Sequence, residues 1–345
     1  MIRFESDYLE GAHPLILEHL LRTNMEQTPG YGTDSYCAHA CDLIRRHCHA
    51  PQSSVHLLSG GTQTNAVVIS SILRPHQGVI CAESGHINIH ETGAIEAGGH
   101  KVLSLPSTDG TLSAAAIQAY CDAHFQDSDC EHIVQPGMVY LSFPTENGTL
   151  YSKEQLTKIS RVCRNLSLPL YLDGARLGYG LASPKNDLTL PDIAALCDVF
   201  YIGGTKVGAL FGEAVVISNP NLQKDFRYLI KQHGALLAKG RLLGIQFETL
   251  FTDDLYFKIS RHAVEMALQI RQALEERKIS LYYDSCTNQQ FPVLTTEQTA
   301  ILEKDFSFSH WKKLPDHRNV IRLCTSWATR SQHTAQLCEV IHTRL

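Results

Sequence analysis

The feature that most constrains the fold is a regular alternation of short apolar runs with helical patterns between Leu57 and Val216. Gly, Pro or Asp ends each run, as in βα units. Five runs are typical of strands, namely 79–82, 101–105, 138–143, 170–173 and 199–203. The segments 113–124 and 152–166 have the spacing of amphipathic helices, and Ser152 with Gln155 matches a capping box. We therefore expect an α/β fold with a mainly parallel sheet sandwiched by helices.

The pattern changes after residue 250, which divides the chain into expected domains. One long helical stretch at about 253–278, short strands near 291–294 and 319–323 and a closing helix predict a smaller C-terminal α/β domain over 251–345. The first 25 residues hold one helical pattern, 14–22, and are expected to form an N-terminal arm. Residues 26–250 would then form the large domain, and 345 residues suffice for this division.

Composition limits the partners of the chain. Charged residues make up 19% of it, the net charge is −5, and the basic residues are scattered, which argues against nucleic-acid binding and favours a small molecule. Four charged side chains within the first ten residues and the lack of long apolar runs argue against secretion and membrane spanning. An odd count of 11 cysteines fits a reducing cytoplasm.

A loop rich in glycine and hydroxyl residues, from Ser59 to Asn65, lies between an apolar run and the helical run 66–73. Backbone N–H groups and hydroxyls therefore gather at a helix N-terminus, which suits a phosphate. The loop matches neither the GxGxxG pattern nor a Walker A loop, so by itself it also fits an ordinary strand-to-helix turn.

Two charged positions follow expected strands at the carboxyl edge of the sheet, where α/β sites form. Asp173 ends one strand and is followed by Arg176; the alternative role of this aspartate is a helix cap. Lys206 follows the next strand in otherwise apolar sequence, where desolvation lowers the pKa of a lysine. Such a lysine can form a Schiff base, although a solvent-facing loop lysine is the alternative.

A phosphate loop, a carboxylate for a pyridinium nitrogen and an imine-forming lysine, in this order, describe a pyridoxal-phosphate site. Here the chain resembles the threonine aldolase and β-eliminating lyase group of fold-type-I pyridoxal-phosphate enzymes, over nearly its whole length. The segments that carry the resemblance are 4–8, 31–34, 59–65, 83–86, 173–176, 203–206 and 321–327. The resemblance implies bound pyridoxal 5'-phosphate and a homodimer or homotetramer with the active site at the subunit interface.

The resemblance also implies how the cofactor is held. Lys206 would bond to it covalently, Asp173 would pair with its pyridine nitrogen, and His86 would stack on its ring. Gly61 and Thr62 would hold its phosphate. An ionised aspartate keeps the pyridine nitrogen protonated, and the protonated ring is the electron sink for a carbanion at the substrate Cα.

For the substrate, the resemblance implies that Ser6, Arg176 and Arg322 bind the carboxylate of an amino acid, with Arg176 also near the ring hydroxyl of the cofactor. A planar guanidinium grips a carboxylate at two points, which lysine does not reproduce. The chain departs from the family in one segment. Many threonine aldolases carry a histidine in the segment matching 143–149, where this chain has Thr145 and Glu146. Such a pair resembles the low-specificity threonine and phenylserine aldolases.

This departure leaves open which group removes the β-hydroxyl proton of the substrate. Glu146, His86, His90 or a water held by them are the candidates, because a base needs reach and a pKa near the working pH. Tyr31, His90 and Thr145 are expected near the substrate side chain.

Two further groups of residues suggest binding sites, one for a metal ion and one for the cofactor phosphate. Cys37, Cys41 and Cys48 lie among histidines, but their spacing is not that of a zinc finger or ribbon, so packing of thiols on a helix is preferred and no metal is expected. The basic stretch 224–241 is either a solvated face or, as the resemblance implies, the source of a residue that binds the cofactor phosphate of the neighbouring subunit. Lys239 is our choice for that residue.

The resulting expectation is a lyase of amino-acid metabolism that cleaves threonine, allo-threonine or phenylserine to glycine and an aldehyde. The alternatives are another pyridoxal-phosphate enzyme (a β-eliminating lyase, an aminotransferase or a racemase) and a non-enzymatic binding module of the same fold. Release of free aldehyde with glycine separates the aldolase from the others.

Overall fold

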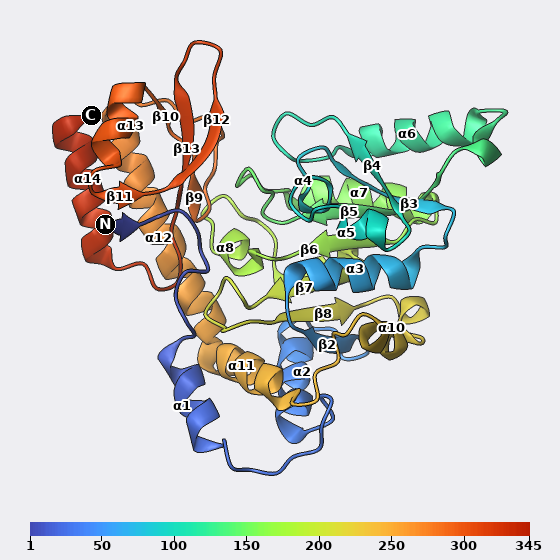
Figure 1. Cartoon of the computed structure of the whole chain (residues 1–345). Coiled ribbons are helices and arrows are strands. Elements are labelled where there is room, and N and C mark those ends of the chain that lie inside the picture. The colour runs from blue at the N-terminus through green and yellow to red at the C-terminus, as the bar shows by residue number, and fades with distance from the viewer.

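The computed structural model describes residues 1–345. Figure 1 shows a large part built on a central sheet, a smaller part that carries the C-terminus, and an N-terminal arm that contacts both. The arm begins with β1 (Ile2–Arg3), which pairs in parallel with β11 (Phe306–Ser307) of the smaller part, and continues to α1 (Pro14–Arg22), which packs on α11 (Arg241–Phe251) of the large part. The helix predicted over 14–22 is confirmed at both ends.

The central sheet has seven strands in the order β2-β8-β7-β6-β5-β3-β4. From β4 to β7 all neighbours are parallel, and β8 is antiparallel to both β7 and β2, so the mainly parallel sheet is confirmed. The strands are β2 (Ser54–Leu58), β3 (Gln77–Ala82), β4 (Lys101–Leu105), β5 (Gln135–Ser142), β6 (Leu170–Asp173), β7 (Val199–Gly203) and β8 (Glu213–Ile217).

Successive strand residues point to opposite faces of the sheet, and here both faces carry buried apolar side chains. Helices therefore cover both faces. Met138 and Tyr140 of β5 belong to one core cluster, while Val139 and Leu141 belong to the other. The first cluster lies under α3 (Gly61–Ile72), α4 (His86–Ile89), α5 (Ala94–Ala97) and α10 (Phe226–Gln232). The second lies under α2 (Ser35–His47), α6 (Ala114–Gln126), α7 (Lys153–Asn165), α8 (Leu177–Leu181), α9 (Leu190–Leu196) and α11. The capping box predicted at Ser152 is present at the start of α7.

The connection from β7 to β8 is short, so the chain reverses and β8 pairs antiparallel to β7. The amides of Gly204 and Thr205 both donate to Gly212 O (2.9 and 3.1 Å), which closes the loop. Gly212 has φ 130°, a conformation open to glycine alone. This closed loop carries Lys206 at the carboxyl edge of the parallel strands.

The smaller part consists of α12 (Leu255–Glu276), α13 (Thr296–Leu302), α14 (Ser331–Arg344) and short strands, and its largest pairing is the hairpin of β12 (Ser309–Lys313) and β13 (Asn319–Cys324). β10 (Val293–Leu294) and β9 (Gln289–Gln290) also pair with β13. Ile259 and Ala263 of α12 pack in the core of the large part, whereas Ile270 and Leu274 pack in the core of the smaller one. The two parts therefore share this helix, and the domain boundary after residue 250 stays a prediction.

Single-turn helices complete the chain at η1 (Cys130–His132), η2 (Pro220–Leu222) and η3 (Thr252–Asp254). None of the helices combines the length and the apolar character that crossing a lipid bilayer requires. The thiols of Cys37 and Cys41 in α2 donate to the backbone oxygens of Gly240 and Val55, and all 11 cysteines are free.

Candidate active site

The Gly-rich loop forms a cup at the start of α3. Gly60 is the N-cap residue, and no side chain bonds to the first amides of the helix. Those N–H groups therefore remain as donors at the positive end of the helix dipole, which attracts an anion. Ser59, Gly60, Gly61 and Thr62 line a cavity of about 330 Å³ that also contains Asp173 and Lys206.

Asp173 ends β6 and is almost completely buried. Its Oδ2 accepts from the Tyr140 hydroxyl (2.6 Å) and from Asn65 Nδ2 (3.1 Å), and its Oδ1 accepts from the amide of Ala175 (3.0 Å). Burial, followed by the charge of Asp173, raises the pKa of Tyr140 well above 10, so the phenol stays a donor. Three donors from separate segments thus fix the carboxylate at the bottom of the cavity. A Cβ on the next residue, Gly174, would lie 1.9 Å from Tyr201 O, so this turn requires glycine.

Lys206 lies on the loop between β7 and β8 and lines both this cavity and the larger cleft beside it. Burial, and then the charge of Arg176, lowers the pKa of Lys206, while the carboxyl groups of Asp7, Asp173 and Glu213 oppose that shift. A lysine with a lowered pKa is available as a neutral amine, the form that attacks a carbonyl.

Glu213 lies next to Lys206 at the start of β8. Its two carboxyl oxygens accept from the Thr205 hydroxyl (2.7 Å) and from the amide of Gly204 (3.2 Å), and burial raises its pKa to about 8. Glu213 was not among the site residues predicted from the sequence. A charged residue at the start of the apolar run 214–217 was the available signal.

His86 begins α4, above the cavity. Its Nδ1 lies 2.7 Å from Glu91 Oε1, and Asn65 Nδ2 donates to the same carboxyl oxygen (2.7 Å) as well as to Asp173. Burial opposes protonation of His86, but the hydrogen bond to Glu91 raises its pKa above the ordinary value. Asn65 therefore links the carboxyl groups behind His86 and at the bottom of the cavity. Glu91 was not predicted from the sequence. It lies five residues after His86, but its contact with Asn65, 26 residues away, depends on the fold.

Glu146 lies beside His86, and its Oε1 accepts from the Ser142 hydroxyl (2.7 Å) and from the His86 amide (3.1 Å). Burial raises the pKa of Glu146, and the charge of Asp173 acts in the same direction. Glu146 lines the cleft, as do His86 and His90. Thr145, by contrast, is fully buried, and its hydroxyl contacts Thr149 and the backbone of Asp109, so it does not line the cleft.

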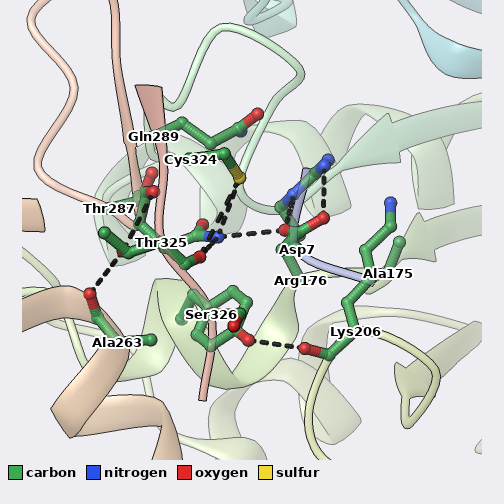
Figure 2. A network of polar contacts seen from close by, with 12 residues as sticks. Asp7, Ala175, Arg176, Lys206, Ala263, Thr287, Gln289, Cys324, Thr325 and Ser326 are labelled. Carbon is green, nitrogen blue, oxygen red and sulfur yellow. Dashed lines mark hydrogen bonds and ion pairs between the residues drawn. The ribbon is translucent and has the colours of Figure 1, made fainter. Parts of the chain in front are cut away.

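Arg176 follows Asp173 by three residues and projects into the cleft, where Asp7 of the arm binds it (Figure 2). Asp7 Oδ2 accepts from Arg176 Nε (2.6 Å) and Asp7 Oδ1 from Nη2 (3.0 Å), a two-point ion pair. Asn288 Nδ2 donates to Asp7 Oδ2 (2.9 Å) and to Thr325 O (2.8 Å). Despite burial, the charges of Arg176 and Lys206 hold the pKa of Asp7 well below its usual range. The arm and both parts of the chain therefore meet at Arg176, and Asp7 was not selected from the sequence.

Arg322 reaches the cleft from β13. Its Nη2 donates to Glu5 O (2.9 Å) and to the Ser309 hydroxyl (3.3 Å), and its Nη1 donates to Gln289 Oε1 (3.3 Å). The Nε of Arg322 and the hydroxyl of Ser6 are buried without a hydrogen-bond partner. Buried polar groups normally have partners, so each of these donors has unused hydrogen-bonding capacity. Arg322 lines the cleft, whereas Ser6 lines neither the cleft nor the cavity.

Tyr31 and Lys239 lie away from the cleft of their own chain. Both are exposed, and the Tyr31 amide bonds to Ala238 O (3.1 Å) beside Lys239. Lys231 lies over the Tyr31 ring, with Nζ 4.7 Å from its centroid. Neither residue lines the cleft or the cavity.

The residues that surround the cavity fit the pyridoxal phosphate expected from the sequence. Free helix amides suit its phosphate, Asp173 offers a carboxylate to its ring nitrogen, and Lys206 offers an amine of lowered pKa. The adjoining cleft of about 640 Å³ holds Arg322 and shares Arg176, Glu146, Lys206 and His86 with the cavity. The arrangement can bind a phosphate, an aromatic ring and an amino-acid carboxylate side by side.

Comparison with known proteins gives three consistent findings. The model of the β-eliminating lyase family matches residues 4–303. The low-specificity L-threonine aldolases of Pseudomonas aeruginosa and a second Pseudomonas strain are each 32% identical to the chain, over 76% of the chain and 75% of each relative. The solved structure of a threonine aldolase from Leishmania major is 48% identical, covers 99% of this chain with 98% of its own, and has a TM-score of 0.96.

More distant structures share the fold. An aspartate aminotransferase from Thermus thermophilus, 12% identical with a TM-score of 0.72, covers the whole chain with 92% of its own. The fold is therefore that of the fold-type-I enzymes expected from the sequence.

Proposed function

This chain belongs to the β-eliminating lyase family, and on that premise we propose that it is a pyridoxal-phosphate-dependent aldolase that cleaves L-threonine and related β-hydroxy-α-amino acids to glycine and an aldehyde. The observation that carries the proposal is the meeting of Lys206, Arg176 and Arg322 in one cleft, beside a cavity with Asp173 at its bottom. The names of the relatives, all threonine aldolases at 32% identity or above, support the reaction.

Five residues would hold the cofactor. Gly61 and Thr62 would bind its phosphate, Asp173 its ring nitrogen and His86 one face of its ring, while Lys206 would bond to it covalently. When bound, the cofactor supplies an electron sink for the pair left at the substrate Cα.

The residues of the chain bind and orient the amino acid. Arg322 and Arg176 would take the carboxylate, with the Ser6 hydroxyl as a further donor, because Ser6 Oγ and Arg322 Nε are buried donors without partners. A carboxylate held at these points fixes the rotation about Cα, so that the Cα–Cβ bond is the one placed for cleavage.

Proton transfer would fall to the group formed by Glu146 and His86, with His90 nearby. One of them, or a water between them, accepts the β-hydroxyl proton as the Cα–Cβ bond breaks and the aldehyde leaves. The electron pair remains at Cα, which takes up a proton to give glycine. Burial raises the pKa of Glu146, which makes its carboxylate a stronger base than an exposed one.

We also propose a homodimer or homotetramer in which Tyr31 and Lys239 complete the site of a neighbouring chain. Both are exposed, and so are the large apolar side chains of Leu17, Leu21 and Met25, in α1 and just after it. Contiguous exposed apolar surface is typical of an interface. Eleven free cysteines support a location in the cytoplasm.

A lysine replacement tests the reaction and the attachment together. Lys206→Ala is compared with Lys158→Ala, which removes an exposed lysine paired with Glu154 on α7. Both proteins are loaded with pyridoxal phosphate and reduced with borohydride, and peptides are mapped for the adduct. Glycine and acetaldehyde from threonine are then quantified.

We expect the control and the wild type to carry the adduct on Lys206 and to release glycine and acetaldehyde in equal amounts, and Lys206→Ala to do neither. Full turnover by Lys206→Ala would refute the assignment. In place of glycine and acetaldehyde, 2-oxobutyrate with ammonia would favour elimination. The corresponding β-hydroxy keto acid would favour transamination, and threonine inverted at Cα would favour racemisation.

A further inference from the structure

Aromatic side chains line the cleft together with the two arginines. Trp311 and Tyr283 come from the smaller part, Tyr8 from the arm, and His90 from the segment after α4. Tyr8 also lines the cavity that contains Asp173, whereas the other three line the cleft alone. None of these three side chains is needed to hold the phosphate, the ring or the carboxylate.

The position of Trp311 follows from an irregularity in the β12–β13 hairpin. Ser309 pairs with Arg322 and His310 with Ile321, but the next pair is Lys312 with Val320, so Trp311 is an extra residue in β12. A β-bulge of this kind re-aims a side chain out of the regular alternation. β12 is the strand of the hairpin on the side of the large part (Figure 1), and the indole lines the cleft between them.

The indole is held on two sides. The ring of Phe291, which is fully buried, meets it edge-on at 5.2 Å between centroids, and Tyr283 in turn meets Phe291 at 5.2 Å. The guanidinium carbon of Arg322 lies 5.4 Å from the centroid of the Trp311 ring. A carboxylate bound to Arg322 therefore brings the rest of the amino acid next to a fixed aromatic face.

A second aromatic ring, that of His90, lies next to the indole. The His90 ring lies 6.4 Å from Trp311 between centroids and 5.5 Å from the His86 ring. The substrate has its carboxylate on the arginines and its nitrogen toward Lys206, so its Cβ substituent extends into the space that Trp311 and His90 border. The methyl group of threonine fills little of that space, whereas an aryl group can contact both rings.

We propose that Trp311 is a specificity-determining residue that packs against the β-substituent, and that the cleft favours β-hydroxy-α-amino acids with an aryl substituent over threonine. This inference rests on the proposed aldolase function. It concerns the side chain of the substrate and leaves the cleavage step unchanged.

The test is the ratio of kcat/KM for phenylserine to kcat/KM for threonine, measured on the full-length protein loaded with pyridoxal phosphate. Trp311 also supports Arg322, so its loss weakens the hold on the carboxylate of both substrates, and that effect cancels in the ratio. Trp311→Phe keeps a ring, Trp311→Leu keeps apolar volume alone, and Trp311→Ala keeps neither. Lys313→Ala, exposed at the end of the same strand, is the control.

We expect the wild type to prefer phenylserine, and the ratio to fall about tenfold in Trp311→Ala and Trp311→Leu, mainly through KM, since an aromatic contact and its buried area are lost. Trp311→Phe and the control should stay close to the wild type. If Trp311→Ala fails to fold, Trp311→Leu gives the same comparison.

A wild type without preference for phenylserine, or a ratio unchanged in both Trp311→Ala and Trp311→Leu while threonine is still cleaved, overturns the inference and leaves the aldolase in place. A wild type that cleaves neither substrate overturns the aldolase itself.

Discussion

Replacing Asp7 with asparagine tests how the cleft holds Arg176. The Asp7 carboxylate is fully buried and pairs with Nε and Nη2 of Arg176 at 2.6 and 3.0 Å, while the Arg176 side chain is only 11% exposed. Asparagine keeps the size of the side chain and one acceptor but removes the charge that balances the guanidinium. Water has little access to replace it, so Arg176 would be left as a buried charge without a counter-ion.

Three effects follow from this geometry. Breaking a buried ion pair by removing one partner lowers the free energy of unfolding by about 3–5 kcal/mol. Because the asparagine amide oxygen can still accept one hydrogen bond from Arg176, we expect a loss at the lower end, about 3 kcal/mol. A hydrogen bond to a charged group contributes about 1.5–3 kcal/mol, so a disordered Arg176 raises KM for threonine about 10- to 100-fold, with a smaller fall in kcat. The Asp7 charge also opposes the burial that lowers the pKa of Lys206, so this pKa falls further in the variant.

The assay measures all three in parallel with a control. Denaturation midpoints give the stability, steady-state kinetics give KM and kcat, and the pH dependence of pyridoxal-phosphate capture by the free protein gives the pKa of Lys206. Asp42→Asn removes an exposed pair with Arg45 on α2 and should change stability by less than about 1 kcal/mol. A variant with the stability and KM of the wild type and an unshifted capture profile would refute the positioning role of Asp7.

Two other changes probe the bottom of the cavity. Tyr140→Phe removes the hydroxyl that donates to Asp173 at 2.6 Å, so kcat for threonine should fall about fivefold, the value of one hydrogen bond. Asp173→Asn should lower kcat far more. Equal losses of kcat in the two variants would contradict this order. Burial raises the pKa of Glu213 from 4.5 to about 8, so between about pH 5 and 8 the folded protein binds more protons than the unfolded chain and its stability falls as pH rises. Glu213→Gln removes this pH dependence. The denaturation midpoint of the cofactor-free variant, relative to that of the wild type, should therefore rise between about pH 5 and 8. A difference that does not change with pH would argue against a raised pKa of Glu213.

Local sequence patterns predicted most of the elements. The helix 14–22 and the strands 101–105, 170–173 and 199–203 have the expected ends. Pro14 begins the helix, and Pro106, Gly174 and Gly204 follow the strands, so these ends depend on neighbouring residues. The reversal at β8 and the bulge at Trp311 were not predicted, since strand direction and register depend on a partner strand elsewhere in the chain.

The candidate site was predicted unevenly for the same reason. Lys206, Asp173, His86 and Arg176 lie at the ends of strands or just after them, where a parallel sheet gathers its side chains, and the structure brings them to one cleft. Asp7, Glu91 and Glu213 act through contacts with other segments. Asp7 and Arg176 are 169 residues apart, and Asp7 and Asn288 are 281 apart, so no spacing rule could connect them.

The sequence by itself determined the alternation of strands and helices and the chemical groups placed at the strand ends, because side-chain periodicity and turn conformation depend on residues a few positions away. Only the tertiary structure decided which carboxylate pairs with which cation and which donors remain free. A buried charge is stable only beside an opposite charge or a hydrogen-bond partner, and the segments that supply these partners meet only in the folded chain. Arg176 pairs with Asp7 for this reason, while Ser6 Oγ and Arg322 Nε are buried without a hydrogen-bond partner.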